Sequence, residues 1–255
     1  MKPPLGDSSP DLSVVIPFYN EADGVEHVAE TLARLDALLA QRELVAEYLF
    51  VDDGSVDGTA DLLRARLGTH PAFRLLAHPG NRGFGAAFRT GAEGAHAPLL
   101  ACYDFDCTYP VEDVLALLDA LEAQGADVAT ASPYHPGGEV VGVSAGRLLQ
   151  SKAASALYRV ALGRASRGIH TFSCAFRVYR REALLALPPW SDRFLAASEV
   201  LAQAILRGLK VVEVPSVLSQ RQFGVSKLRS LPTTVAHLRM LGRLGAGRLR
   251  RKLLG

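Results

Sequence analysis

The sequence lacks any run of apolar residues near the length of about 18 that a membrane-spanning helix requires. Its first ten residues also lack the apolar core of a signal peptide. Cysteine is scarce, because the chain has only Cys102, Cys107 and Cys174, and none of them belongs to a C-x-x-C pair. The odd number excludes a complete set of disulfides, and the spacing excludes the usual structural zinc sites. We therefore expect a cytoplasmic, intracellular protein.

Acidic residues are absent from the last part of the chain, residues 215–255, which nevertheless carries nine Lys and Arg residues. The small net charge of +2 hides this basic C-terminus and gives no indication of nucleic acid as a partner. Leucines alternate with the arginines, so residues 231–255 are expected to form a basic amphipathic helix that lies on a membrane surface. The alternative is a helix that packs its leucines on the domain and exposes its arginines to water.

The composition is that of an ordinary globular protein, with 255 residues of which 49% are hydrophobic and 21% charged. Short apolar runs alternate with helical spacings of apolar residues, which predicts βαβ units and a parallel sheet. We expect a flexible tail over residues 1–11 and one α/β domain over residues 12–230. The expected strands are 12–16 (ended by Pro17), 48–51, 73–77, 98–103, 127–131, 172–179 and 209–214, and the expected helices are 25–39, 62–67, 83–93, 111–123, 147–162 and 194–206.

Two glycine-rich phosphate-binding motifs are missing from the chain. The first strand-to-helix turn has no G-x-G-x-x-G, and no G-x-x-x-x-G-K-[ST] occurs, which argues against a dinucleotide cradle and a P-loop. Polar residues gather instead where expected strands end, and the carboxyl ends of parallel strands are where open sheets bind ligands. These residues are Tyr19 and Glu21 after the first strand, Asp53 after the second, and Asp104 and Asp106 after the fourth.

The segment Asp104–Phe105–Asp106 carries the most specific chemical signal. Two carboxylates spaced i, i+2 would share one side of an extended segment. Such charges repel each other when no cation lies between them, and a hard divalent cation such as Mg²⁺ or Mn²⁺ relieves the repulsion. A metal held in this way keeps room for phosphate oxygens, so a diphosphate-bearing substrate is expected. A solvated turn is the alternative for so short a motif.

Several segments follow one another in a recognisable order: Ile16–Glu21, Val51–Ser55, Asn81–Gly83, Asp104–Asp106, Phe176–Glu182 and Arg221–Leu228. The first five resemble the motifs of family 2 glycosyltransferases. The last resembles the R-x-x-G-x-S-K-L motif of the dolichyl- or polyprenyl-phosphate mannose synthase branch. The resemblance covers residues 12–228 and implies a GT-A fold, in which helices flank a Rossmann-like, mostly parallel sheet.

The resemblance also implies roles for individual residues. The nucleotide would be held by Pro17, Tyr19, Glu21, Val51, Asp53, Asp104 and Phe105. The divalent metal would be held by Asp104, Asp106 and Thr108, with Asp106 as the main ligand. Catalysis would depend on Asp106 together with Arg221 and Lys227, because fixed cations near the donor diphosphate or the acceptor phosphate stabilise the charge that develops there.

The reaction that the resemblance implies is an inverting, metal-dependent sugar transfer from a nucleotide-diphosphate sugar to a polyprenyl phosphate at the cytoplasmic membrane face. An acceptor phosphate is already ionised near neutral pH and needs little help from a general base, which agrees with the lack of an evident catalytic histidine. His135 and His170 lie nearest the expected site and are interpreted as loop or core residues, and Glu199 is a further acidic candidate. Many members of the family carry C-terminal membrane spans, so a separate membrane subunit is a possible partner.

Several positions depart from the pattern of the family. Thr108 stands where a metal-binding glutamine is usual, and Pro133 replaces the arginine of a Ser-Arg-Tyr motif. Thr171 stands where an aspartate is common, and Cys174–Ala175 replaces Ser-Gly. These departures fall in the metal and acceptor neighbourhoods, so they bear on the metal ligands and on the choice of acceptor.

Three other interpretations remain open from the sequence. Asp104–Phe105–Asp106–Cys107–Thr108 also fits the D-x-D-x-T motif of haloacid-dehalogenase-type phosphatases, although that motif normally follows the first strand rather than the fourth. The departures at Thr108 and Pro133 are compatible with a non-catalytic protein that binds a nucleotide sugar. A glycosyltransferase with a non-lipid acceptor is the third possibility, and Asp53 or Glu199 would then serve as the base.

Overall fold

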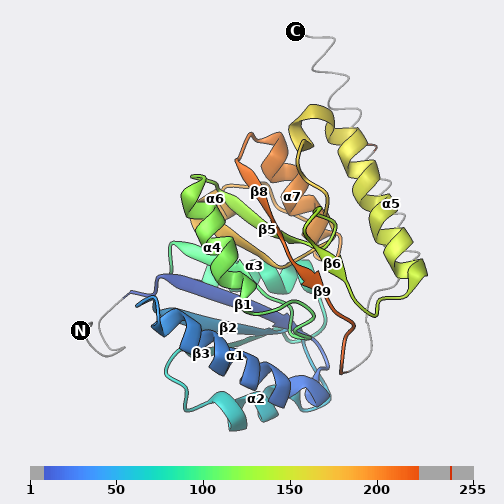
Figure 1. The fold of residues 1–255 in the computed structure, drawn as a ribbon. Helices are drawn as coiled ribbons and strands as arrows, with labels where there is room; N and C mark the ends of the chain where they lie inside the picture. Colours follow the sequence, from blue (N-terminus) through green and yellow to red (C-terminus); the bar gives the residue numbers. More distant parts are fainter. Residues whose placement is uncertain (1–8, 224–241, 243–255) are drawn as a thin grey trace.

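The computed structural model describes residues 9–223 and residue 242, and a seven-stranded sheet forms its centre (Figure 1). All neighbouring strands are parallel except β7, which runs antiparallel to both of its neighbours. Two short parallel strands, β6 (Glu139–Val140) and β9 (Val217–Leu218), pair separately. The order across the sheet is β3 (Phe73–Ala77), β2 (Ala46–Asp52), β1 (Leu12–Phe18), β4 (Leu99–Cys102), β7 (Arg177–Arg180), β5 (Val128–Ser132) and β8 (Val211–Pro215).

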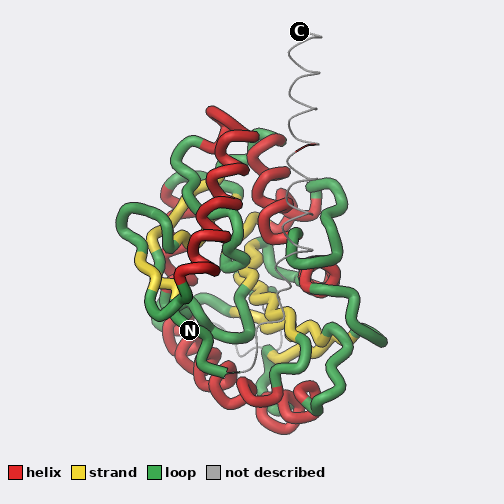
Figure 2. Tube along the Cα trace, turned by 90° about the vertical axis from the view of Figure 1, so that its right-hand side faces the viewer, coloured by secondary structure: helices red, strands yellow, loops and turns green. Residues whose placement is uncertain are grey.

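Helices cover both faces of the sheet (Figures 1 and 2). Alternate side chains of β1 enter two separate cores, because Val14 and Ile16 point to one face and Val15 to the other. The first core is closed by α1 (Val25–Ala40), α2 (Thr59–Leu67) and α4 (Asp113–Ala123), and the second by α3 (Phe84–Gly94), α5 (Ala145–Leu162), α6 (Arg181–Leu185) and α7 (Ala196–Leu206). Short 3-10 helices, η1 (Ala22–Gly24) and η2 (Gly163–Ser166), precede α1 and follow α5. No helix within residues 9–223 combines the length and the hydropathy needed to cross a membrane.

Pro17 does not end the first strand as the sequence predicted, because β1 continues to Phe18. The carbonyl oxygen of Phe18 faces β2, where it accepts a hydrogen bond of 2.9 Å from the backbone N–H of Asp53. The carbonyl oxygen of Val15 faces β4 and accepts one of 3.0 Å from Tyr103. Pro17 therefore faces the β4 side, beyond the last paired residue of β4, where its missing N–H costs the sheet no hydrogen bond.

The strand expected over residues 172–179 is shorter in the structure, because β7 begins only at Arg177. The preceding apolar residues are buried, and side chains rather than a neighbouring strand satisfy the backbone groups of Phe172. The hydroxyl of Ser155 accepts a hydrogen bond of 3.2 Å from the N–H of Phe172, and the guanidinium of Arg177 donates one of 3.0 Å to the carbonyl of Phe172. An apolar run bounded by such partners resembles a strand in sequence but forms a buried loop.

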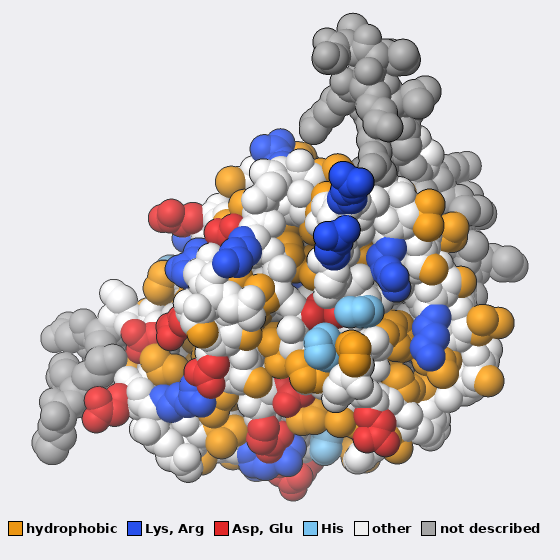
Figure 3. All heavy atoms as spheres, turned by 45° about the horizontal axis from the view of Figure 1, so that its top comes forward, with side chains coloured by type: hydrophobic (Ala, Val, Ile, Leu, Met, Phe, Trp, Pro, Cys, Tyr) orange, Lys and Arg blue, Asp and Glu red, His pale blue; other side chains and the backbone are white. Residues whose placement is uncertain are grey.

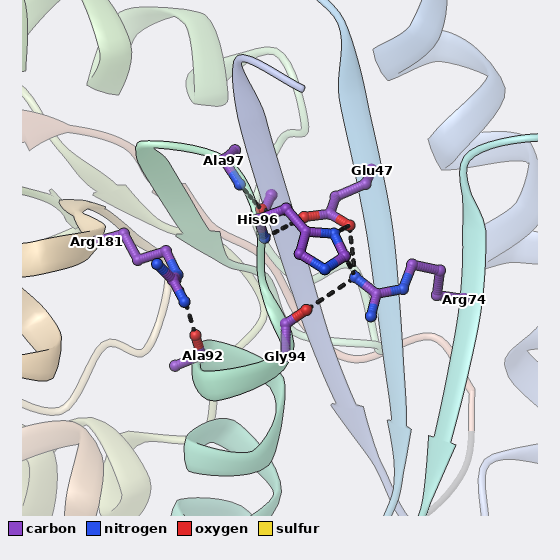
Figure 4. A network of polar contacts seen from close by, with 8 residues as sticks. Glu47, Arg74, Ala92, Gly94, His96, Ala97 and Arg181 are labelled. Atoms are coloured by element: carbon purple, nitrogen blue, oxygen red, sulfur yellow. Dashed lines mark hydrogen bonds and ion pairs between the residues drawn. The ribbon is translucent and has the colours of Figure 1, made fainter. Parts of the chain in front are cut away.

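A buried carboxylate, Glu47, ties together the amino ends of the central strands (Figure 4). It accepts hydrogen bonds of 2.6 Å from the Ser13 hydroxyl, from the backbone N–H of His96 and from the Arg74 guanidinium. Burial by itself would raise the pKa of Glu47, but the bonds from Ser13, His96 and Arg74 outweigh it and lower the pKa. This network fixes the turn between α3 and β4 at the edge of the sheet opposite the candidate site.

Candidate active site

The carboxyl ends of β1, β2 and β4 bring three polar segments to one edge of the sheet, as the sequence predicted. The segment after β1 is held against the turn after β2 by side-chain hydrogen bonds to its backbone. Ser55 Oγ accepts from the N–H of Asn20 at 2.9 Å, and Thr59 Oγ1 accepts from the N–H of Glu21 at 2.9 Å. Asn20 has a positive φ of 53° and uses its side chain to accept from the N–H of Val56. The position of Glu21 is therefore fixed by the backbone.

Arg221 joins two acidic residues that lie far apart in the sequence. Its Nη2 donates to Glu21 Oε1 at 2.5 Å, and its Nε lies 3.3 Å from Asp106 Oδ2. All three side chains are largely shielded from water, with exposed fractions of 16% for Arg221, 9% for Glu21 and 23% for Asp106. The structure thus brings Arg221 to the predicted site, whereas Lys227 lies outside the described residues.

Asp104 and Asp106 lie on a turn and not on the extended segment expected from the sequence. The carbonyl of Asp104 accepts a hydrogen bond of 3.0 Å from the N–H of Cys107, whose φ is +49°. Burial raises the pKa of Asp104 to about 7, and the charge of Asp106 adds to this rise, whereas the guanidinium groups of Arg221 and Arg177 oppose it. The two carboxylates are close enough to interact strongly, as the sequence predicted, although the backbone that places them is different.

The physical reason for the turn is Phe105, whose side chain points into the protein. It is 4% exposed and packs against Phe18 and Phe50, with ring centroids 5.3 and 6.2 Å away. Burying this ring between the two aspartates forces the chain to fold back around it. Val51 is also fully buried, and it is the register partner of Pro17 in the sheet. The side chains of Phe105 and Val51 therefore belong to the cores, and a nucleotide would meet these two residues only through their backbone.

Thr108 takes part in the site through its backbone. Its N–H lies 3.4 Å from Asp106 Oδ1, and its carbonyl oxygen accepts a hydrogen bond of 2.9 Å from the N–H of Ser219, just beyond β9. This bond connects the aspartate turn to the segment that carries Arg221. Within the part of the chain that the structure describes, no three His, Cys, Asp or Glu side chains are placed together to hold a metal. Asp104 and Asp106 form a pair of carboxylates rather than such a cluster.

Asp53 lies at the same edge, but its carboxylate is occupied by groups of the protein. The backbone N–H groups of Arg82 and Gly83 donate to it at 2.9 and 2.6 Å, and the His78 ring nitrogen Nδ1 lies 2.8 Å from Oδ1. The neighbouring Gly54, at φ +79°, packs so closely on the backbone of Gly80 that a Cβ would lie 2.5 Å from its Cα. Asp53 therefore holds the loop over residues 80–83, which includes the Asn81–Gly83 motif, in place.

Arg177 is a residue of the site to which the sequence had assigned no role. It is fully buried, and its guanidinium donates to Thr130 Oγ1 at 3.0 Å and to the carbonyl oxygens of Phe172 and Ala197. Its positive charge holds the pKa of Asp104 lower than burial alone would set it. Arg177 belongs to the Phe176–Glu182 motif that the sequence analysis identified. Its partners lie in four separate segments of the chain, so the sequence alone did not predict them.

Three other candidates from the sequence, Glu199, His170 and His135, contact loops beside β5 and α7 rather than the aspartate turn. Glu199, in the first turn of α7, accepts a hydrogen bond of 2.8 Å from the backbone N–H of Ser191. His170 is bound to Glu213 of β8, with its ring Nδ1 2.8 Å from Oε2, and the His135 ring packs edge-on against the His170 ring at 5.8 Å. These contacts hold neighbouring loops together. They lie beside β5 and α7, two or more strands away from β1.

Comparison of the sequence with known families identifies the group to which the chain belongs. The sequence profile described as Glycosyl transferase family 2 matches residues 13–187. The chain belongs to glycosyltransferase family 2. As a member of this family it is an enzyme that transfers sugars. The phosphatase interpretation of Asp104–Thr108 is therefore wrong, and the D-x-D segment follows the fourth strand because it belongs to a glycosyltransferase sheet.

The family includes relatives that match almost the whole chain. The polyprenol monophosphomannose synthase of Mycolicibacterium smegmatis is 33% identical over 247 residues, which cover 92% of this chain and 89% of the relative. The undecaprenyl-phosphate mannosyltransferase of Micrococcus luteus is 29% identical over 84% of this chain and 86% of its own length. The dolichol-phosphate mannosyltransferase of Pyrococcus furiosus is 30% identical over 91% of this chain and 63% of its own length.

Solved structures confirm the predicted GT-A fold. Glucosyl-3-phosphoglycerate synthase from Mycobacterium tuberculosis, in complex with Mn²⁺, UDP and glucosyl-3-phosphoglycerate, superposes with a TM-score of 0.64 at 18% identity, covering 94% of this chain and 80% of that one. The mannosyltransferase PcManGT from Pyrobaculum calidifontis, in complex with GDP-Man and Mn²⁺, gives 0.60 at 20% identity and covers 96% and 65%. At this level of identity the likeness concerns the fold alone.

Proposed function

We propose that this glycosyltransferase transfers a hexose, with inversion at the anomeric carbon, from a nucleotide-diphosphate sugar to a polyprenyl phosphate. The observation that carries the proposal is the cluster of Glu21, Asp104, Asp106 and Arg221 at the carboxyl edge of the sheet. The same chain is 33% identical to a polyprenol monophosphomannose synthase over nearly its full length. A cluster with both acidic and cationic groups suits a donor that carries a diphosphate.

The nucleotide of the donor would lie over the ends of β1 and β2. Pro17, Tyr19 and Glu21 would contact its base and ribose, with Val51 and Asp104 alongside. Asp53 would act on the donor through the loop over residues 80–83, since its oxygens already accept bonds from Arg82, Gly83 and His78. Phe105 would hold the aspartate turn in position from within the core.

The site fits a hard divalent cation such as Mg²⁺ or Mn²⁺. Asp104 and Asp106 supply oxygen ligands that interact unfavourably when no cation separates them, and burial increases that cost. These two residues would hold the ion, with Thr108 supporting Asp106 through its backbone N–H. Such an ion, when bound, neutralises charge on the diphosphate leaving group. The structural neighbours in complex with Mn²⁺ or Mg²⁺ and a nucleotide support this assignment by analogy of fold.

The chain's own residues would orient the donor and neutralise charge in the reaction. Arg221 stands between Glu21 and Asp106 and can redirect its guanidinium to a diphosphate oxygen at the same place, and Lys227 would add a second cation. An acceptor phosphate oxygen, already ionised near neutral pH, would attack the anomeric carbon from the face opposite the departing diphosphate. The carbon–oxygen bond to the diphosphate breaks as the new bond forms, so no protein base has to accept a proton.

Attachment to a membrane surface is the remaining part of the proposal. The basic segment 231–255 would bind anionic lipids at the cytoplasmic face, and a separate membrane subunit would serve as an anchoring partner. Relatives named for polyprenol, undecaprenyl and dolichol phosphates act on lipid substrates, which supports a position at the membrane.

The test is transfer of labelled sugar from a panel of GDP- and UDP-sugars to polyprenyl phosphate, with Mg²⁺, with Mn²⁺ and with a chelator. We expect one donor class to give a lipid product that requires the metal and has the opposite anomeric configuration to the donor. Transfer only to water-soluble acceptors would favour the non-lipid alternative. Binding of nucleotide without transfer to any acceptor would favour the non-catalytic alternative, and a chelator-resistant product would contradict the metal requirement.

A further inference from the structure

A hollow lies at the carboxyl edge of the sheet, between α5 and the loops that follow β5 and η2. It has a volume of about 200 Å³ and is separate from the cluster around Asp106. β7 alone separates β5 from β4, so the ends of those strands lie about 10 Å apart at the usual strand spacing. The hollow therefore lies at the same edge of the sheet as the cluster around Asp106, without sharing its residues. Its lining consists of Tyr134, Lys152, Ser155, Ala156, Arg159 and His170.

Among the residues that the structure describes, the cations of this hollow have no acidic partner. Lys152 and Arg159 lie seven residues apart on α5, which places them on the same side of the helix two turns apart. Within the described residues neither side chain belongs to an ion pair, and the Lys152 ammonium lies 5.4 Å from the centre of the Tyr134 ring. Two unpaired cations that face one small space favour an anionic ligand there.

The sequence around the hollow is free of acid over a long stretch. Residues 140–181 contain no Asp or Glu but eight Lys and Arg residues. In Figure 3, which shows one face of the molecule, Lys and Arg side chains occur on both sides, whereas Asp and Glu side chains lie mostly toward the lower left and are few at the upper right. The electrostatic potential on this side thus favours a negatively charged substrate group.

The carboxylate of Glu213, which contacts the lining residue His170, already accepts hydrogen bonds from groups of the protein. The Glu213 side chain is only 1% exposed, and it accepts hydrogen bonds from the backbone N–H groups of His170 and Thr171 at 2.6 and 2.7 Å. It also binds the His170 ring at Nδ1, 2.8 Å away, which leaves Nε2 as the ring's other polar atom. Glu213 therefore fixes the orientation of His170, and its buried oxygens are directed to these groups of the protein.

Two uncharged residues lie together beside the hollow. The hydroxyl of Thr171 lies 2.7 Å from that of Ser132, next to Pro133. The end of β5 therefore supplies neither a cation nor an acid to the hollow at these positions. Lys152 and Arg159 of α5 supply positive charge to the same neighbourhood from the opposite side.

We propose that this hollow binds the phosphate of the acceptor, with Lys152 and Arg159 as the cationic ligands and His170 and Ser155 as further polar contacts. The inference rests on the proposed function, because it assigns the acceptor side of the same reaction. The phosphate can belong to a lipid headgroup or to a soluble phosphomonoester, since the same cations bind either one.

The test compares Lys152→Ala and Arg159→Ala with the wild-type enzyme in two arms, one with polyprenyl phosphate in micelles and one with glycerol phosphate. For the acceptor that the wild type uses, each variant should raise the acceptor KM about tenfold or more, as expected for loss of one charge-assisted hydrogen bond. The donor KM should stay unchanged, and Arg159→Lys should restore most of the loss. Arg164→Ala removes a cation from the same acid-free stretch but outside the hollow, and it should behave as wild type.

The two arms and a direct binding measurement separate the outcomes. A raised KM for polyprenyl phosphate alone assigns the hollow to a lipid headgroup, and a raised KM for glycerol phosphate alone assigns it to a soluble acceptor. An acceptor KM equal to wild type in both variants overturns the inference. If the wild type transfers sugar to neither acceptor, the proposed function fails. Binding of inorganic phosphate then tests separately whether the hollow is an anion site. In that case, equal phosphate affinity in wild type and in Lys152→Ala/Arg159→Ala overturns it.

Discussion

Arg221 is the residue on which the balance of charge at the site depends. It stands between Glu21 and Asp106 and lowers the pKa of Asp104 against the effect of burial. Together with Arg177, it offsets the charge of three carboxylates that are largely shielded from water. Arg221 also places a cation where we propose that the donor diphosphate enters.

Replacing Arg221 by alanine should lower kcat/KM about a hundredfold, the usual loss when one fixed donor to a developing charge is removed. Lysine at the same position should retain part of the activity, since it keeps the charge but not the planar fork of donors. Steady-state kinetics at saturating metal would measure both variants, with thermal melting to confirm the fold. Wild-type activity in the folded alanine variant would contradict the role given to Arg221.

Asp53 makes a second prediction at the residue scale. Asn at position 53 can accept through only one oxygen, and its amide would face a backbone N–H of Arg82 or Gly83. Asp53→Asn should therefore lower the free energy of unfolding by about 2 kcal/mol. Urea unfolding would measure this, with Asp61→Asn as the matched control, because the Asp61 side chain is 85% exposed. An equal effect of the two substitutions would show that the buried hydrogen bonds of Asp53 contribute nothing.

The elements of the sheet were largely readable from the sequence, and the connections were not. The strand Phe73–Ala77 has the predicted bounds, because its apolar run and its flanking residues agree. The turn at Asp104–Cys107 was missed, since it depends on the burial of Phe105 against two other strands. The roles of Arg177 and Glu213 were also missed, because their partners lie up to 47 residues away in the chain. Local patterns specify strands and helices, but buried polar partners depend on the assembled fold.

At the scale of elements, Glu47 holds the starts of β1, β2 and β4 together. The pKa of this glutamate in the folded protein is below its ordinary value of 4.5, so the ionised form stabilises the fold. That contribution is fully present above the ordinary pKa and is lost as the pH falls through the lower, folded value. Acidification should therefore weaken this edge of the sheet.

The variant Glu47→Gln tests this at two pH values. Near pH 7 it should lower the free energy of unfolding by about 2 kcal/mol, because the bond from Arg74 loses its charge assistance. The difference from wild type should shrink as the pH falls from the ordinary value of 4.5 through the lower pKa of the folded state, where the wild-type side chain also becomes neutral. Denaturant unfolding at both pH values would measure it. A difference that stays constant or grows on acidification would contradict the account.

At the scale of the whole molecule, the buried polar network and the candidate active site lie at opposite edges of the sheet. The Glu47 network lies at the amino edge, whereas the aspartate turn, Arg221 and the hollow beside α5 lie at the carboxyl edge. Charge is also divided along the chain, because residues 140–181 and 215–255 contain no acid. The donor site that we propose lies at the ends of strands from the acidic first half of the chain, and the basic stretches belong to the second half.

The basic end of the chain gives a prediction for the complete protein. The enzyme should cosediment with vesicles that contain anionic lipid, and added salt should weaken this binding. Replacing Arg248, Arg250 and Arg251 together by glutamine should weaken it strongly, since each cation near an anionic surface contributes about 1 kcal/mol. The control replaces Arg34 of α1, Arg42 just after α1 and Arg64 of α2 by glutamine, which removes the same number of positive charges from another part of the surface. Equal loss in the two triple variants would contradict a specific role for the C-terminal segment.

The central claim is that the enzyme transfers a sugar to a polyprenyl phosphate and that the carboxylates after β4 are required for this transfer. The most direct measurement is formation of labelled lipid product by wild type, by Asp106→Asn and by Asp119→Asn, an exposed carboxylate of α4 as control. We predict product with the wild type and with the Asp119 variant, and a loss of about a hundredfold or more with Asp106→Asn. Full activity of a folded Asp106→Asn variant would contradict the account, as would the absence of lipid product from the wild type with every donor.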